Sequence, residues 1–190
     1  MHPQKMRKLR GKAAEEMVKA RLPDIGCMLE RSYEGGEKTA RKMQPDLDVV
    51  CDGKATNIEV KEATMLESAG HSVAGHQQFR LGRFQLSPDG VSKMVRKKGC
   101  YALVVDDPIS NSITIDFVKP DIIDDEFRRL AKTGQSPKFP TYRVLELRQD
   151  RCFPDIGTMV ADRGELEMYM DKEWNLSYKR ELAQRKEKDG

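Results

Sequence analysis

Two short runs of alternating polar and apolar residues decide the fold of this chain: DLDVV at residues 46–50 and IEVK at residues 58–61. The polar stretch between them contains the Asp52-Gly53 step, which favours a tight hairpin turn. Side chains alternate across a strand, so the acids and the lysine share one face and the aliphatic residues share the other. The pattern predicts a two-stranded ribbon with one polar face.

The register of this ribbon determines which polar side chains meet. A turn centred on residues 53–54 places Asp48 opposite Glu59 and Asp46 opposite Lys61. Three carboxylates and one ammonium group then lie on one face. An exposed sheet edge with cross-strand ion pairs carries the same pattern, so the ribbon alone leaves a structural and a functional interpretation open.

The functional interpretation is metal-assisted hydrolysis of a phosphodiester. Mg²⁺ prefers oxygen ligands and keeps several water molecules, so two carboxylates on neighbouring strands can hold one ion beside a phosphate. A lysine on the same face can stabilise charge that develops on the phosphate, or help to deprotonate a water molecule. An aspartate followed by Glu-x-Lys supplies these groups.

The composition predicts one domain with a real core, with or without an appended subdomain. The chain has 190 residues, of which 38% are hydrophobic and 34% charged. No apolar run approaches the roughly 20 residues that span a bilayer, and the basic N-terminus is not followed by an apolar segment. We therefore expect a cytoplasmic protein without a membrane anchor.

Charge and cysteine content narrow the interpretation only slightly. The net charge of +3 conceals basic clusters near the N-terminus and at residues 93–98, which permit nucleic-acid binding but also occur in many other soluble proteins. The four cysteines have no Cys-x-x-Cys spacing. We expect reduced thiols and no structural zinc.

The order of predicted elements indicates an α/β fold, with a mixed central sheet flanked by helices. Expected helices cover residues 9–22, 91–95 and a segment from residue 120, and expected strands cover residues 27–33, 101–105, 112–118 and 142–147, besides the ribbon and an extended run at 79–86. Residues 62–78 are predicted to form a long loop. Residues 165–170 fit either a helix or a strand, and a charged tail follows.

The ribbon and its neighbours resemble the PD-(D/E)xK nuclease superfamily. The matching residues are PDLDVV at 45–50 and IEVK at 58–61. GKAAE at 11–15 is similar to a helix of archaeal Holliday-junction resolvases, and Gln85 precedes a helix and an apolar strand, as in many members. The resemblance implies a restriction-endonuclease-like αβββαβ core. We expect this nuclease core at residues 1–118 and a C-terminal extension, packed on it, at residues 119–190.

The resemblance also implies roles for individual residues. Glu59 is expected to be a metal ligand and Lys61 the catalytic lysine. The acid that completes the metal site is Asp48 or Asp46; Asp48 is slightly favoured because it faces Glu59 in the predicted register. Glu15 is expected to bind the metal directly or through water, and Gln85 to orient water or contact a phosphate. The implied cofactor is Mg²⁺, for which Mn²⁺ can substitute.

The function expected from these features is that of a metal-dependent DNA endonuclease, in repair, recombination or restriction. Alternatives are an exonuclease, an RNA-cleaving enzyme, and a non-catalytic nucleic-acid-binding protein of the same fold. A homodimer is plausible, because two related sites can cut two strands. The basic residues expected to contact nucleic acid are Lys8, Arg10, Lys38, Arg41, Lys42, Arg80 and Arg83.

Overall fold

The structure is a computed structural model, and it describes residues 3–33, 45–73, 76–136, 139–140, 151–153 and 155–188. A six-stranded sheet forms the centre, in the order β1 (Cys27–Ser32), β2 (Leu47–Cys51), β3 (Lys54–Thr64), β7 (Cys100–Asp107), β8 (Ser112–Val118) and β10 (Met159–Asp162). Only the pair β3–β7 is parallel, and the other neighbours are antiparallel. The predicted α/β fold with a mixed sheet is confirmed.

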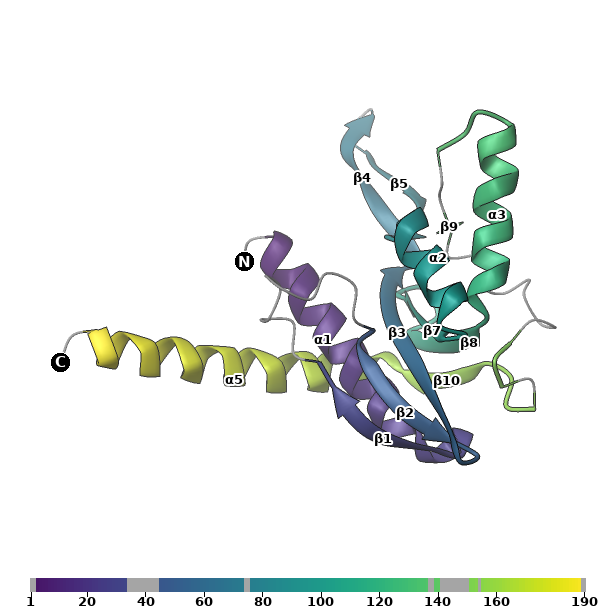
Figure 1. Cartoon of the computed structure of the whole chain (residues 1–190). Coiled ribbons are helices and arrows are strands. Elements are labelled where there is room, and N and C mark those ends of the chain that lie inside the picture. The colour runs from purple at the N-terminus through teal and green to yellow at the C-terminus, as the bar shows by residue number, and fades with distance from the viewer. Residues whose placement is uncertain are drawn as a thin grey trace.

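Helices cover both faces of this sheet (Figure 1). On one face lie α1 (Pro3–Arg21) and α5 (Arg163–Lys188), and their buried residues Met17, Val18 and Leu166 belong to the same core cluster as Ile58. On the other face lie α2 (Pro88–Arg96) and α3 (Pro120–Lys132), which pack in a second cluster with the strands. The fold therefore has three layers.

Local sequence signals account for the ends of several elements. The Ser87 hydroxyl accepts the Gly90 N–H at 3.1 Å and caps α2, which begins at Pro88. A short 3₁₀ helix (Pro23–Ile25) follows α1, and Gly26, at φ +67°, ends it in the left-handed conformation that glycine tolerates. β7 is buried along almost its whole length, as its apolar sequence predicted for a central strand.

The predicted long loop at residues 62–78 is wrong. β3 continues to Thr64, and β4 (Leu66–Val73) and β5 (His76–Leu81) form an antiparallel hairpin (Figure 1). These strands could not be predicted from apolar alternation, because polar and glycine residues predominate in them. They form a separate two-stranded sheet and need no such alternation. At Gly82 the chain returns so close to β3 that a Cβ would lie 1.6 Å from the Thr64 carbonyl oxygen, so only glycine fits there.

The C-terminal region contributes to the same sheet. β10 pairs with β8, and the segment at residues 165–170 proves to be helical, as part of α5. The guanidinium of Arg21 on α1 donates to both carboxylate oxygens of Glu165, at 2.8 and 2.6 Å. The far half of α5 extends beyond α1 (Figure 1).

A small pair, β6 (Arg83–Phe84) with β9 (Phe139–Pro140), lies outside the main sheet. The predicted strand at 142–147 lies outside the described residues.

The four cysteines form two disulfides, whereas the sequence predicted free thiols. Cys27 lies opposite Cys51 across β1 and β2, with a Cα–Cα distance of 4.2 Å, and the two form a disulfide. Cys100 and Cys152 form a second disulfide, with a Cα–Cα distance of 6.3 Å. The predicted free thiols are therefore wrong for this structure. The two pairs could not be predicted from the sequence, because their cysteines are 24 and 52 residues apart. Strand pairing and tertiary packing bring them together.

Candidate active site

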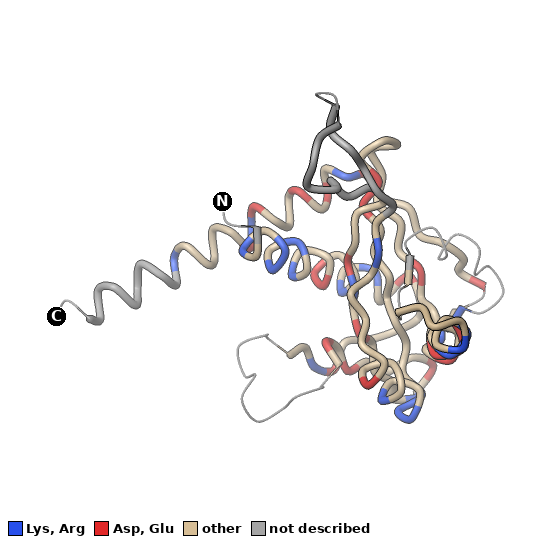
Figure 2. The backbone as a smooth tube through the Cα atoms, turned by 90° about the horizontal axis from the view of Figure 1, so that it is seen from above, with Lys and Arg blue, Asp and Glu red and all other residues tan. Residues whose placement is uncertain are grey.

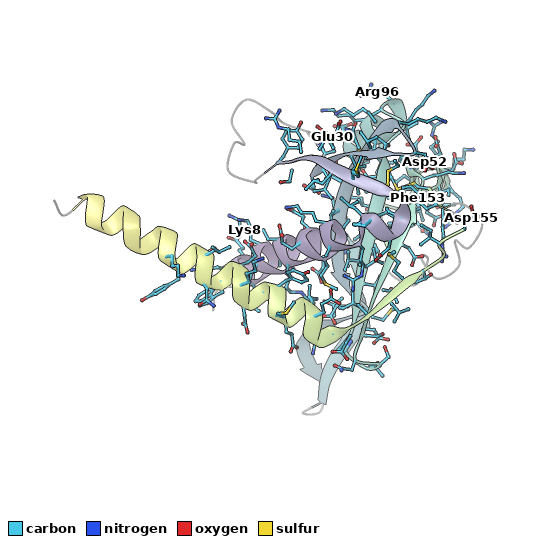
Figure 3. The ribbon with its side chains drawn as sticks, turned by 90° about the horizontal axis from the view of Figure 1, so that it is seen from below. Lys8, Glu30, Asp52, Arg96, Phe153 and Asp155 are labelled. Atoms are coloured by element: carbon cyan, nitrogen blue, oxygen red, sulfur yellow. A yellow bond between two sulfur atoms is a disulfide. The ribbon has the colours of Figure 1, made fainter. Side chains whose placement is uncertain are left out.

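The turn of the ribbon sets its register. Asp52 (φ 50°) and Gly53 (φ 74°) are both left-handed, as in the two-residue turns that Asp-Gly favours, and Asp52 lies at the ribbon's tip (Figure 3). The predicted turn was one residue too far along the chain. Asp48 consequently pairs with Asn57, and the same register carried past Leu47 places Asp46 opposite Glu59. The predicted register was wrong by two residues, although the polar face is the predicted one.

Asp46 is fixed against β3 by a hydrogen bond to the main chain. The Val60 N–H donates to its Oδ2 atom at 2.8 Å. Asp46 immediately precedes β2 and follows Pro45, which has no N–H to give to a strand ladder. Because Val60 stands between Glu59 and Lys61, this bond holds the Asp46 carboxylate beside both of their side chains.

Glu59 and Lys61 form an ion pair on the polar face of β3. Lys61 Nζ lies 2.5 Å from Glu59 Oε1, and the side chains are 30% and 20% exposed, so solvent reaches both. Burial alone would lower the pKa of Lys61, but the nearby carboxylates of Glu59, Asp46 and Glu15 outweigh it and raise that pKa. Lys61 is therefore an ammonium ion at neutral pH.

Two carboxyl groups of the site hold protons more tightly than usual. Burial, followed by repulsion from Glu59, raises the pKa of Asp46 to about 6. Burial, followed by repulsion from Asp46, raises the pKa of Glu15 to about 7. Glu15 lies on α1, and its charge interacts with those of Asp46 and Lys61. Burial and mutual repulsion disfavour the ionised forms of these carboxyl groups. A bound cation would therefore stabilise the ionised cluster.

Tyr101 also belongs to this site, and the sequence indicated only that it would be a core residue. It lies on β7 directly beside Glu59, because β3 and β7 are parallel neighbours. It is 2% exposed, and burial, followed by the charges of Glu59 and Asp46, raises the pKa of its phenol. Only the register between two strands far apart in the sequence reveals it.

Asp48 has different surroundings. The Tyr33 hydroxyl donates to its Oδ2 atom at 2.5 Å, and the Asn57 amide donates to its Oδ1 atom at 2.6 Å. Both oxygens thus have neutral donors, and the partner in the register is Asn57 rather than Glu59. The structure brings Glu15, Asp46, Glu59 and Lys61 together; which aspartate binds a metal stays a prediction.

A pocket of about 600 Å³ opens beside Glu59 and Lys61. Gln85 and Arg83 line it, and both side chains are exposed. The predicted catalytic glutamine therefore lies at the same pocket as Glu59 and Lys61. Its role there stays a prediction.

The carboxylates of the site are the donors that a divalent cation would use. Within the described ranges, no three His, Cys, Asp or Glu side chains are arranged to hold a metal ion. Glu59 on β3 and Asp46, directly before the neighbouring β2, nevertheless offer hard oxygen donors, and Mg²⁺ commonly binds through one or two carboxylates while water fills its other positions. The chemistry of these two donors suits Mg²⁺ or Mn²⁺, and the charge of Glu15 interacts with that of Asp46.

Arg10 was predicted to contact nucleic acid, but its guanidinium is engaged inside the protein. It donates to Glu62 Oε1 and, at 2.7 Å, to Asp106 Oδ2. Asp106 is 1% exposed and also accepts from Arg163 at 2.8 Å. This charged network ties α1, β3, β7 and α5 together. The structure thus gives Arg10 a role in holding α1 to the ends of two strands.

The other predicted contact residues are spread over the chain. Lys8 is exposed on α1 (Figure 3), where basic residues gather in the N-terminal half of the helix (Figure 2). Arg83 is exposed on β6. Arg80 lies on β5, but its side chain is outside the described part. Lys38, Arg41 and Lys42 lie outside the described residues.

Comparison of the chain with models of protein families and with curated proteins gave no match. Among the described residues, no helix is both long and apolar enough to cross a membrane.

Proposed function

We propose that this protein is a metal-dependent nuclease that hydrolyses phosphodiester bonds in DNA. The observation that carries the proposal is the hydrogen bond from the Val60 N–H to Asp46, which sets this carboxylate beside Glu59 and Lys61. The resemblance to the PD-(D/E)xK nucleases rests on these same residues. An edge stabilised by ion pairs alone would not require the two raised carboxyl pKa values.

Asp46 and Glu59 are the proposed ligands of one Mg²⁺ ion. When bound, such an ion lowers the pKa of a coordinated water and neutralises charge on a phosphate. The carboxylate of Asp46 is held in place by the main chain of β3, so little reorganisation is needed to present it. Glu15 has a pKa of about 7 and can therefore accept or release a proton near neutral pH.

Lys61 is the proposed electrostatic stabiliser of the phosphate. Its raised pKa keeps the ammonium charged, and Nζ reaches Glu59 Oε1 on the solvent-accessible side of the strand. A phosphate oxygen close to Nζ would receive a charge-assisted hydrogen bond as negative charge increases. Gln85 lines the same pocket, where its amide can contact the bound substrate.

The proposal is tested by incubating the protein with single-stranded, duplex and branched DNA, with Mg²⁺, with Mn²⁺ and with EDTA. We expect cleavage that needs the metal and falls at least about 100-fold in Lys61→Ala, because a key transition-state donor is lost. Lys54→Ala is the matched control: it removes an exposed lysine from the far end of the same strand. We expect it to leave cleavage unchanged.

Two results would count against the assignment. Cleavage that survives in Lys61→Ala would exclude this lysine, and binding of DNA without cleavage under any metal would favour a non-catalytic binding protein. RNA and DNA with free ends in the same panel distinguish the proposed endonuclease from an RNA-cleaving enzyme or an exonuclease.

A further inference from the structure

The pocket beside Lys61 has its walls in elements far apart in the sequence. Glu59 and Lys61 of β3 form its catalytic side. Arg83 of β6, the chain that leads into α2, and Ser136 in the loop after α3 form the rest. The hollow is therefore continuous with the proposed cleavage site, and extends from Lys61 toward the layer of α2 and α3.

The lining of this pocket is chemically mixed. Tyr101 and Phe84 are 2% and 3% exposed and make part of the wall apolar. Gln85 and Ser136 add an amide and a hydroxyl, which can pair with the donors and acceptors on the edge of a base. Arg83 is exposed and lines the pocket, so its guanidinium can donate to a phosphate bound there.

The size of the pocket suits one nucleotide. Its volume of about 600 Å³ lies in the range of sites that enclose small ligands. A base inside a double helix is stacked and paired, and it enters such a hollow only after leaving the stack, at a cost of a few kcal/mol. An unpaired base avoids that cost.

We propose that this pocket binds the base of an unpaired nucleotide next to the phosphate at Lys61, so that the protein prefers single-stranded or locally unpaired DNA to continuous duplex. The inference rests on the proposed nuclease function and adds its substrate class. Arg83 binds the phosphate of the nucleotide in the pocket, while Gln85 and Ser136 contact its base.

The first test measures binding, with EDTA present so that no cleavage occurs. Fluorescence anisotropy compares a labelled single strand, a duplex closed by hairpins at both ends, and the same closed duplex with one bulged nucleotide. We expect the single strand and the bulged duplex to bind at least about tenfold more tightly than the closed duplex, since each base held in a pocket adds appreciable affinity. Equal binding of all three would overturn the inference.

The second test fills the pocket. Ser136→Trp places a large side chain in its wall, and Gln135→Trp makes the same kind of change at the neighbouring exposed residue, which does not line the pocket. We expect Ser136→Trp alone to lose about tenfold in affinity for the single strand. Unchanged binding by Ser136→Trp would contradict the inference, and circular dichroism confirms that both variants are folded.

A small phosphodiester separates failure of the inference from failure of the proposed function. Bis(4-nitrophenyl) phosphate has no base, so its hydrolysis with Mn²⁺ reports on phosphodiester cleavage separately from binding of a base, and Gln135→Trp, outside the pocket lining, is expected to hydrolyse it as the unsubstituted protein does. If no phosphodiester is cleaved but the binding preference holds, the nuclease proposal fails and the unpaired-nucleotide pocket stands. If cleavage occurs equally on closed duplex and single strand, the nuclease proposal stands and the pocket assignment fails.

Discussion

The main-chain N–H of Val60 holds the Asp46 carboxylate in the site. The residues of the polar face could be predicted from the sequence, because alternation along a strand assigns Glu59 and Lys61 to one face in any register that keeps the hairpin. The pairing could not be predicted, because moving the turn by one residue moves every cross-strand partner by two. Asp48 therefore faced Glu59 in the predicted ribbon, while Asp46 faces it in the folded one.

The raised pKa of Glu15 predicts a specific pH dependence of stability. Its pKa rises from 4.5 to about 7 on folding, so the folded state binds the extra proton and the resulting stabilisation is lost as pH rises through that interval. In Glu15→Gln the loss cannot occur. Between pH about 5 and about 8, the free energy of unfolding of Glu15→Gln should rise relative to the unsubstituted protein by about 2 kcal/mol, as measured by urea unfolding in EDTA.

The neighbouring residue provides the control for this measurement. Glu16 pairs with Lys19 at 2.6 Å, and its side chain is 32% exposed. Glu16→Gln is therefore expected to show no comparable gain between the two pH values. If the stability of both variants responds to pH alike, the result would contradict the burial of Glu15 beside Asp46.

At the scale of elements, α1 is held to the sheet by charges as well as by its apolar face. The sequence predicted the helix from its apolar spacing and its end from Pro23 and Gly26, both of which are local signals. Its anchor was not predictable, because Arg10 finds its partners 52 and 96 residues further along the chain. The same residue on an exposed face would have been free for a phosphate.

Removing the acceptor at the centre of this network should destabilise the protein. Asp106 is 1% exposed and receives Arg10 and Arg163, so Asp106→Ala leaves two partly buried cations without their shared partner. We expect a loss of about 3 kcal/mol in the free energy of unfolding, measured with urea at neutral pH. Asp155→Ala, at an exposed position (Figure 3), is expected to change it by less than about 0.5 kcal/mol. A small effect at Asp106 would show that α1 needs no charged anchor.

At the scale of the whole molecule, apolar periodicity in the sequence predicted the central strands of the fold, but it did not predict every strand or every strand pairing. The buried run at β7 and the alternating run at β8 were predictable from their apolar periodicity. The hairpin of β4 and β5 was not, because its polar and glycine residues lack apolar alternation, and the pairing of β10 with β8 was not, because it joins segments far apart in the sequence. A homodimer remains a prediction that sedimentation analysis can test.

The disulfides join residues that are far apart in the sequence, and their contribution to stability can be predicted. Cys100 and Cys152 are 52 residues apart, and a link that closes such a loop constrains the unfolded chain. We expect the unreduced protein to show no titratable thiol in denaturant, and Cys100→Ala with Cys152→Ala to lower the unfolding free energy by about 2–4 kcal/mol. Four titratable thiols in protein that has never been exposed to reductant would contradict the pairing.

The most direct test of the site compares its two aspartates by single-turnover cleavage of one labelled DNA strand with Mg²⁺. Asp46 contacts the β3 main chain beside Glu59, whereas Asp48 is held by Tyr33 and Asn57. We expect Asp46→Asn to slow cleavage by at least about 100-fold and Asp48→Asn by less than about tenfold. Strong loss in Asp48→Asn with little effect of Asp46→Asn would contradict the assignment of Asp46, Glu59 and Lys61 as the catalytic centre.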